Sequence, residues 1–208
     1  MTKRVLMTAL LSISLIALVG SQAAAHYSGY IAGVHVASLV CEQGIRGVGN
    51  LEDGDALVTC KLTELQLESK CINPAGQEVL GEAAFQGALA GEEELTTDNV
   101  TGKGKATSEV SLDVLQVCTP EIACVNPNWT IDTCIVRSMT AEHKVFKCDG
   151  DGDCDEIDPD TDTPNSIILQ ECVLPPEYDA NNPPPPPDPV TGDRVDYLCT
   201  TTEIDHVL

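Results

Sequence analysis

The sequence predicts an all-β fold in which two packed sheets are stapled together by disulfides. Three observations predict this class. Short segments alternate apolar and polar residues, which is typical of half-buried strands. Ten cysteines occur in 208 residues, whereas aromatic side chains make up only 3% of the chain. No segment has the apolar spacing of a convincing amphipathic helix.

The stretch 51–76 is the centre of the predicted fold. Asp53-Gly54 marks a turn, because glycine adopts positive φ without a steric penalty. Three inward positions then alternate with polar residues: Val58, Cys60 and Leu62. The next two leucines alternate in the opposite phase, which predicts a bulge near Thr63 and Glu64. A helix over 57–69 is the alternative, although threonine and valine are poor helix formers in its first half.

A Cys-x-Asn-Pro motif ends this stretch and recurs further along the chain. The two copies are Cys71–Pro74 and Cys124–Pro127. Proline has no N–H for a sheet ladder and biases the preceding residue towards extended φ/ψ, so the strand is expected to end at the first copy. The fold is therefore expected to be built around two cysteine corners.

Further strands are expected on both sides of this stretch. The first covers residues 27–40 and ends at Cys41. The others are expected at 84–89, 109–117, 129–135, 141–148, 166–174 and 193–202. The single tryptophan, Trp129, is expected to fill the core rather than to form a ligand platform. Seven or eight short strands separated by turn signals are typical of an immunoglobulin-like two-layer sandwich.

Residues 1–25 are typical of a secretory signal peptide. A basic start precedes an apolar run that is shorter than a typical spanning helix, and small residues precede the expected cleavage site. A retained membrane anchor is the alternative. Residues 26–208 are then expected to form one secreted or periplasmic domain, with an acidic insert at 149–165 and a stiff, proline-rich loop at 175–189.

Composition also limits the partners. Ten cysteines in an exported chain predict disulfides, and no C-x-x-C spacing suggests zinc or redox chemistry. The formal net charge of −22 repels nucleic acid and anionic lipid, which excludes both as main partners. An acidic surface suits cations, or simply solubility. The expected partner is an extracellular ligand or a second copy of the chain, and no contact with a membrane is expected after signal cleavage.

Four segments occur in a characteristic order before a closing cysteine: GVGNLEDGDALVTC, CINPAGQ, CVNPNWT and ILQECVLPP. From about Gly47 to Cys199 this order resembles a group of small secreted bacterial β-rich proteins of unknown function, with the pattern C-x-N-P-G-G, then C-x-N-P-x-W-T, then a late cysteine pair. The resemblance implies the disulfides Cys71–Cys124 and Cys172–Cys199. This chain departs at Ala75, where the group has glycine, and adds cysteines and the acidic insert. The group has no known activity, so no catalytic residue is implied.

Six cysteines remain beyond the pairs that the resemblance implies. The expected pairs are Cys41–Cys60 across neighbouring strands, Cys118–Cys134, and Cys148–Cys154 around a loop. Ten cysteines allow very many pairings, and the sequence alone does not choose among them.

The acidic insert places carboxylates at alternate positions, as calcium loops do. The candidate calcium ligands are Asp149, Asp151, Asp153, Asp155 and Asp160. Cys154 stands where an EF-hand loop has glycine, an aspartate replaces the usual bidentate glutamate, and no flanking helices are evident. The insert therefore resembles extracellular calcium loops in general, and calcium is the candidate cofactor. A solvated acidic linker is the alternative.

Cleavage after Ala25 would make His26 the first residue of the mature chain. Its amine and imidazole, with His143 or His35 as a second histidine, could chelate copper in an arrangement that resembles polysaccharide monooxygenases and periplasmic copper carriers. The scarcity of aromatic residues argues against a glycan-binding oxidase, and no hydrolase, zinc-protease or phosphate-loop motif is present. The expected function is therefore a non-enzymatic, secreted structural or binding module of unknown ligand. A copper protein and a subunit of an extracellular assembly that uses exposed strand edges are the alternatives.

Overall fold

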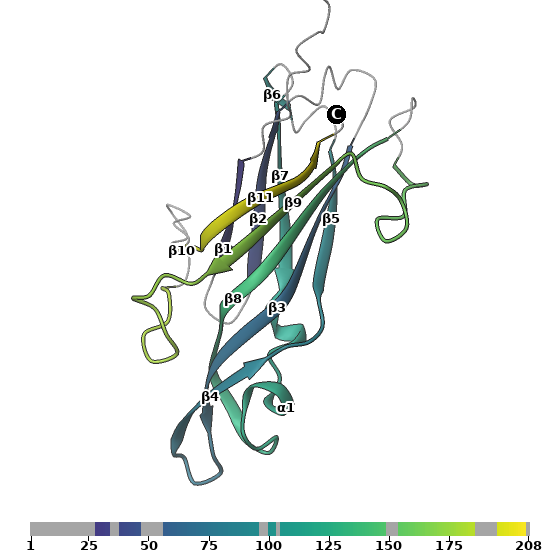
Figure 1. Ribbon diagram of the computed structural model, residues 1–208. Helices are drawn as coiled ribbons and strands as arrows, with labels where there is room; N and C mark the ends of the chain where they lie inside the picture. Colours follow the sequence, from purple (N-terminus) through teal and green to yellow (C-terminus); the bar gives the residue numbers. More distant parts are fainter. Residues whose placement is uncertain are drawn as a thin grey trace, which may run out of the picture.

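The chain folds into two antiparallel β-sheets (Figure 1). A computed structural model describes residues 28–33, 38–46, 56–95, 100–102, 105–148, 154–185 and 195–206. Within these ranges there are eleven strands, a 3-10 turn η2 (Val114–Gln116) and one short helix α1 (Pro120–Ala123). None of the helices in these ranges has the length and apolarity needed to span a bilayer. The predicted all-β, disulfide-stapled class is confirmed.

The strands form two sheets, and within each sheet the spatial order of the strands differs from their order in the chain. The first sheet runs, edge to edge, β10 (Val195–Asp196), β1 (Ser28–Gly33), β2 (Ser38–Arg46), β7 (Lys105–Asp113) and β6 (Val100–Gly102). The second runs β11 (Leu198–His206), β9 (Ser166–Val173), β8 (Thr130–Lys147), β3 (Ala56–Ile72) and β4 (Glu78–Ala84). Strand β5 (Leu89–Leu95) also pairs with β3, beyond the end of β4.

Strands β3 and β8 are the longest of the described strands, with 17 and 18 residues. Their register shifts after Thr63, and Glu64 adopts a left-handed φ of 53°. The predicted bulge at these two residues is therefore confirmed. Leucines on both sides of it remain fully buried, because the extra residue restores the inward phase. The helical alternative for 57–69 is wrong, since these residues form one continuous strand.

The strand expected at 84–89 is wrong, because residues 85–88 interrupt β4 and β5 instead. Strand β5 pairs with β3 before the bulge and β4 pairs with it after the bulge, so the interruption lies opposite the bulged residues. There the Phe85 N–H donates to the Leu65 carbonyl at 2.7 Å. A bulged backbone does not continue a regular ladder, which explains why the partner strand breaks at the same level.

Three other predicted boundaries also differ. Cys41 lies inside β2 rather than at a strand end, because the first expected strand splits into β1 and β2. Strand β7 ends early, at Asp113, whose carboxylate accepts a hydrogen bond from the Leu115 N–H and starts the 3-10 turn. The strands expected at 129–135 and 141–148 are one strand, β8.

The expectation that Trp129 fills the core is wrong. Its side chain is only half-buried and lies outside the main hydrophobic cluster.

One hydrophobic cluster contains buried residues from both sheets. The first sheet contributes Leu39, Cys41, Val110 and Leu112, and the second contributes, among others, Cys60, Leu62, Leu65 and Leu67. A Cβ on Gly91 of β5 would lie 2.7 Å from a methyl group of Val110, so β5 and β7 approach too closely for a side chain there. The two sheets therefore bury their inner faces against one another.

Five disulfides join these elements, and they are the five pairs expected from the sequence. They are Cys41–Cys60, Cys71–Cys124, Cys118–Cys134, Cys148–Cys154 and Cys172–Cys199. Cys41–Cys60 connects β2 to β3 and thereby one sheet to the other. Cys71–Cys124 closes the longest loop, with a sequence separation of 53 residues. Because loop-closure entropy grows with separation, this bond is expected to restrict the unfolded chain most.

The bulge gives the first testable prediction. Glu64→Gly should stabilise the fold by up to about 1 kcal/mol, because glycine adopts left-handed φ without the penalty that a Cβ imposes. Urea denaturation measures the change. The control is Glu82→Gly at an exposed position of β4, where the same substitution should destabilise. A loss of stability in Glu64→Gly equal to that in the control would show that the bulge is not strained.

Candidate functional site

A hollow of about 400 Å³ lies on the outer face of the second sheet, and we call it the outer hollow. Strands β3, β5 and β8 form its floor, and Pro159 and Asp160 of the acidic insert lie along its side. The side chains that the strands contribute are Thr59, Lys61, Ala90, Glu92, Glu142 and Lys144. Its lining therefore combines two lysines with three carboxylates.

Strand alternation explains how this face arises. Cys60 points into the core towards Cys41, so its neighbours Thr59 and Lys61 point to the opposite face. Register then sets two rows across three strands, which are Glu92–Thr59–Lys144 and Ala90–Lys61–Glu142. The Lys144 Nζ lies 3.1 Å from a carboxylate oxygen of Glu142. The same alternation that fills the core thus also places the charged groups of the outer hollow.

The acidic insert is anchored beside the outer hollow. The Cys148–Cys154 disulfide closes the chain just after β8. Both cysteines pack with Leu57 and Phe146, a directly paired couple on the outer face, and Ile157 covers this small cluster. The insert therefore has an apolar attachment to the sheet although most of its residues are charged or polar.

Hydrogen bonds fix the next turn of the insert. An Asp158 carboxylate oxygen accepts from the Asp160 N–H at 3.0 Å, and the Asp158 N–H donates to Asp162 at 2.9 Å. The bond from the Asp160 N–H, followed by one from the Thr161 hydroxyl, lowers the pKa of the Asp158 carboxyl below its usual value. This turn therefore keeps Asp158 ionised and presents Asp160 at the edge of the outer hollow.

The candidate calcium ligands are only partly described. Asp149, Asp151 and Asp153 lie outside the described residues, whereas Asp155 and Asp160 are described and exposed. Within the described ranges, no three metal-ligating side chains come together. The structure thus describes residues 154–165 of the insert, and residues 149–153 lie outside the described ranges.

The candidate copper ligands do not form a described group. His26 and His35 lie outside the described residues. His143 is in the core at 1% exposure, where its Nε2 lies 2.9 Å from the Gln170 side-chain oxygen. The Gln170 amide nitrogen donates in turn to the Thr201 hydroxyl at 3.0 Å. The imidazole of His143 would have to leave this chain of hydrogen bonds to meet a metal at the surface.

Burial controls the protonation of His143. It lowers the pKa of the imidazole from 6.5 to about 4, although the hydrogen bond to Gln170 acts in the opposite direction. The imidazole is therefore neutral at pH 7. Because the Gln170 oxygen can only accept, the proton of the neutral ring lies on Nε2.

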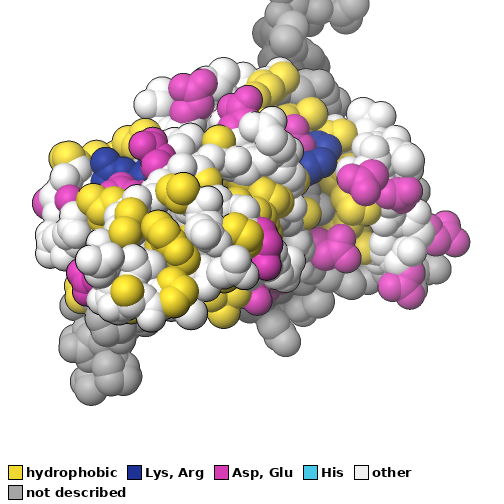
Figure 2. Space-filling model, turned by 90° about the horizontal axis from the view of Figure 1, so that it is seen from below, with side chains coloured by type: hydrophobic (Ala, Val, Ile, Leu, Met, Phe, Trp, Pro, Cys, Tyr) yellow, Lys and Arg dark blue, Asp and Glu magenta, His cyan; other side chains and the backbone are white. Residues whose placement is uncertain are grey.

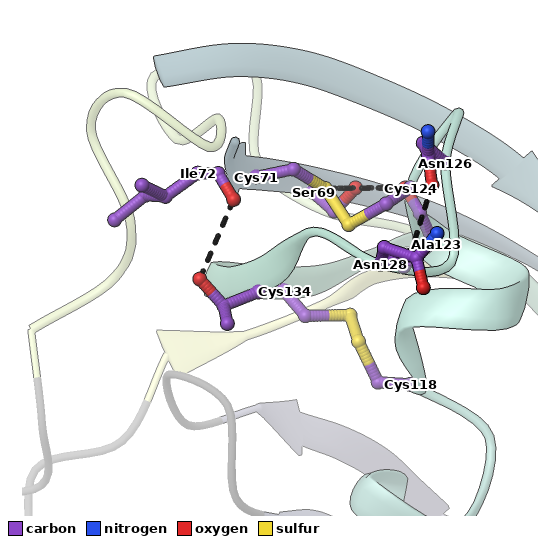
Figure 3. The surroundings of a disulfide bond; sticks show 10 residues. Ser69, Cys71, Ile72, Cys118, Ala123, Cys124, Asn126, Asn128 and Cys134 are labelled. Carbon is purple, nitrogen blue, oxygen red and sulfur yellow. Dashed lines mark hydrogen bonds between the residues drawn. A yellow bond between two sulfur atoms is a disulfide. The ribbon is translucent and has the colours of Figure 1, made fainter. Parts of the chain in front are cut away.

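The two cysteine corners lie with β4 and α1, at the end of the molecule opposite the acidic insert (Figure 1). In each, an asparagine closes the turn. The Asn73 side-chain oxygen accepts from the N–H groups of Ala75 and Gln77 at 2.9 Å, and Asn126 accepts from the Asn128 N–H at 2.9 Å. The Ser69 hydroxyl donates to the Ala123 carbonyl beside the Cys71–Cys124 bond (Figure 3). The Cys-x-Asn-Pro motif is thus a turn motif that the disulfide holds in place.

Apolar side chains are exposed at this corner end. Val125 follows α1 and is 81% exposed, and Leu80 of β4 is 53% exposed. Figure 2 shows this end of the molecule, where hydrophobic side chains gather and acidic side chains lie mostly towards the periphery. Exposed apolar patches of this kind are typical of contact surfaces.

Sequence reasoning missed the lysines and glutamates of the outer hollow. Lys61 in β3 and the Glu142–Lys144 pair in β8 look like ordinary solvent-facing residues of alternating strands. They meet only because β3 and β8 pair across 81 residues, from Lys61 to Glu142. The alternation was visible in the sequence, but the pairing and register were not.

The buried imidazole leads to a prediction on pH. The unfolded state takes up the His143 proton near pH 6.5 and the folded state only near pH 4, so stability is lost as the pH falls through this window. Between pH 7 and pH 5 this loss should be about 2 kcal/mol. Urea denaturation at the two pH values measures it. His143→Gln should remove most of the difference, and an unchanged difference in that variant would contradict the assignment.

No family model, curated protein or solved structure matches this chain. Its function therefore has to be inferred from the chemistry of its own surfaces.

Proposed function

We propose that the protein is a secreted binding module that holds a small extracellular ligand in the outer hollow. The observation that carries this proposal is the hollow of about 400 Å³ between the second sheet and the anchored acidic insert. Ligand sites of small molecules commonly have volumes of roughly 300–1,000 Å³. Six of its side chains stand on paired strands, and sites on strands hold their geometry better than sites on loops.

The disulfides support the proposed location. Five disulfides in one chain are typical of an oxidising, extracytoplasmic compartment. We propose that residues 1–25 are a cleaved signal peptide, because export would bring the chain to such a compartment. N-terminal sequencing of the secreted protein decides the cleavage site, and thereby whether His26 becomes available to a metal.

A ligand screen tests the binding module. Amide chemical shifts in NMR should respond to small extracellular metabolites around Thr59–Lys61, Ala90–Glu92 and Glu142–Lys144. Ala90→Trp should abolish the response, because an indole would fill the outer hollow from an exposed position. Ala84→Trp on β4, exposed but outside the hollow, is the matched control. Binding that Ala84→Trp and Ala90→Trp affect equally would refute the proposed site.

We further propose that calcium stabilises the acidic insert through Asp149, Asp151, Asp153, Asp155 and Asp160. The disulfide at its start and the apolar contact of Ile157 support this proposal, because they reduce the entropy that ion binding must overcome. Carboxylates at alternate positions of the sequence repel one another, and a bound divalent cation would offset this repulsion.

Calcium should therefore raise the melting temperature. For a dissociation constant of about 1 mM, 10 mM calcium adds about 1.4 kcal/mol and raises the Tm by roughly 4 °C. Differential scanning fluorimetry measures the shift, with magnesium as the control ion. Asp151→Asn should reduce the calcium effect. A Tm that 10 mM calcium leaves unchanged would rule out this role.

Self-association is a second candidate role, favoured by the exposed apolar corner end. Val125, at 81% exposure, and Leu80, at 53%, would both lose contact with water in a dimer that joins two corner ends. The corner end would then serve assembly while the outer hollow serves binding.

Sedimentation velocity tests this role over a range of protein concentrations. The wild-type protein should form dimers as the concentration rises, and Val125→Asp should keep it monomeric by placing charges in the contact. Leu198→Asp is the control, because Leu198 is similarly exposed, at 57%, but belongs to β11. A wild-type protein that stays monomeric throughout, or dimers that only Leu198→Asp disrupts, would exclude the corner end.

A further inference from the structure

We infer that the ligand of the outer hollow is a small carboxylate that also carries hydrogen-bond donors, and that Lys61 binds its carboxylate. This inference rests on the proposed binding function and names the class of ligand.

The pairing of the half-buried basic side chains is the first reason. Four described basic side chains are half-buried, and three of them pair with carboxylates: Lys70 with Glu78 at 2.9 Å, Arg137 with Glu68 at 3.0 Å, and Lys144 with Glu142 at 3.1 Å. Within the described part of the chain, no carboxylate oxygen lies within 4.0 Å of the Lys61 ammonium. The Lys61 ammonium therefore does not have to give up an ion pair within the described residues in order to bind the carboxylate of a ligand.

The position of Glu142 explains why Lys61 is left available. The two residues are directly opposite in the β3–β8 register, where opposite charges normally pair. The Glu142 carboxylate instead meets Lys144, two residues along its own strand. On its other side Lys61 faces Ala90, whose short side chain leaves space above the sheet. A carboxylate entering the outer hollow would find the Lys61 ammonium accessible.

The remaining lining identifies the rest of the ligand. Glu92, Glu142 and Asp160 offer carboxylate oxygens, and Thr59 offers a hydroxyl. Carboxylates accept hydrogen bonds and repel anions, so they suit hydroxyl or ammonium groups on the ligand. A simple dianion would be repelled by the three acids, and a simple cation would leave Lys61 without a counter-charge. Sugar acids and amino acids share the required combination of one carboxylate with several donors.

The overall charge of −22 acts against any anion at long range. At physiological ionic strength, however, charges are screened beyond about 8 Å, so the groups that touch the ligand dominate its binding. The test should therefore be made at about 0.15 M salt.

The experiment titrates four probes into the full-length secreted protein and follows amide shifts by NMR. Galacturonate and threonine carry a carboxylate with hydroxyl or ammonium donors, galactose is the matched sugar without the carboxylate, and putrescine is a cation without one. Galacturonate or threonine should shift the amides around Lys61 and Glu142, and the one that binds distinguishes the two sources of donors. Galactose and putrescine should bind at least about tenfold more weakly.

Three variants assign the effect to Lys61. Lys61→Met should weaken carboxylate binding about tenfold or more, and Lys61→Arg should restore most of it. Lys147→Met is the matched control, because Lys147 is exposed on β8 outside the hollow. Thermal melts check that each variant folds. If Lys61→Met does not fold, Lys61→Gln keeps the polar contact and removes the charge, and the same loss is expected.

The outcomes separate this inference from the proposed function. Equal binding of galactose or putrescine, wild-type affinity in Lys61→Met, or no shift with either carboxylate at about 10 mM would overturn the carboxylate assignment. In those cases binding of another class that Ala90→Trp abolishes would leave the proposed binding function intact. Carboxylate binding that survives Ala90→Trp would overturn both.

Discussion

The disulfide between Cys41 and Cys60 is the constraint on which the rest of the structure depends. It joins β2 of one sheet to β3 of the other, and both cysteines are fully buried. Among the described residues, the cluster that the two sheets share has a single buried aromatic residue, Tyr197, whose hydroxyl donates to the Val136 carbonyl at 2.7 Å. With so little aromatic surface to bury, covalent cross-links limit the entropy of the unfolded chain and supply stability that large side chains supply elsewhere.

The same strands that build the core also build the candidate site. Along β3 and β8, one set of alternate residues fills the interior. The other set faces outward, and four of its members line the outer hollow: Thr59, Lys61, Glu142 and Lys144. The bulge at Glu64 preserves this division, because it keeps the leucines beyond it pointing inward. A hollow on such paired strands is held by the whole second sheet, and the anchored acidic insert adds a side to it.

Local features of this fold could be predicted from the sequence, whereas features that depend on strand pairing could not. The phase change between Leu62 and Leu65 predicted the bulge, because alternation is a property of one strand. A strand end was expected at Cys41, yet the pairing of β2 with β7 continues through Gly44 to Arg46. The place of Lys61 in the outer hollow and the burial of His143 could not be predicted, because both depend on which strands lie beside β3 and β8. Two of the disulfides were expected from the resemblance, and the other three were expected from the positions of the remaining cysteines in the sequence.

Native-state hydrogen exchange of the Cys41→Ala/Cys60→Ala variant tests the central claim most directly. With a separation of 19 residues, this bond should contribute about 3 kcal/mol through the unfolded chain. Amides of both β2 and β3 should therefore lose about a hundredfold in protection together. Removal of the 6-residue Cys148–Cys154 link should instead affect mainly the acidic insert. Wild-type protection in both sheets of the Cys41→Ala/Cys60→Ala variant would contradict the account.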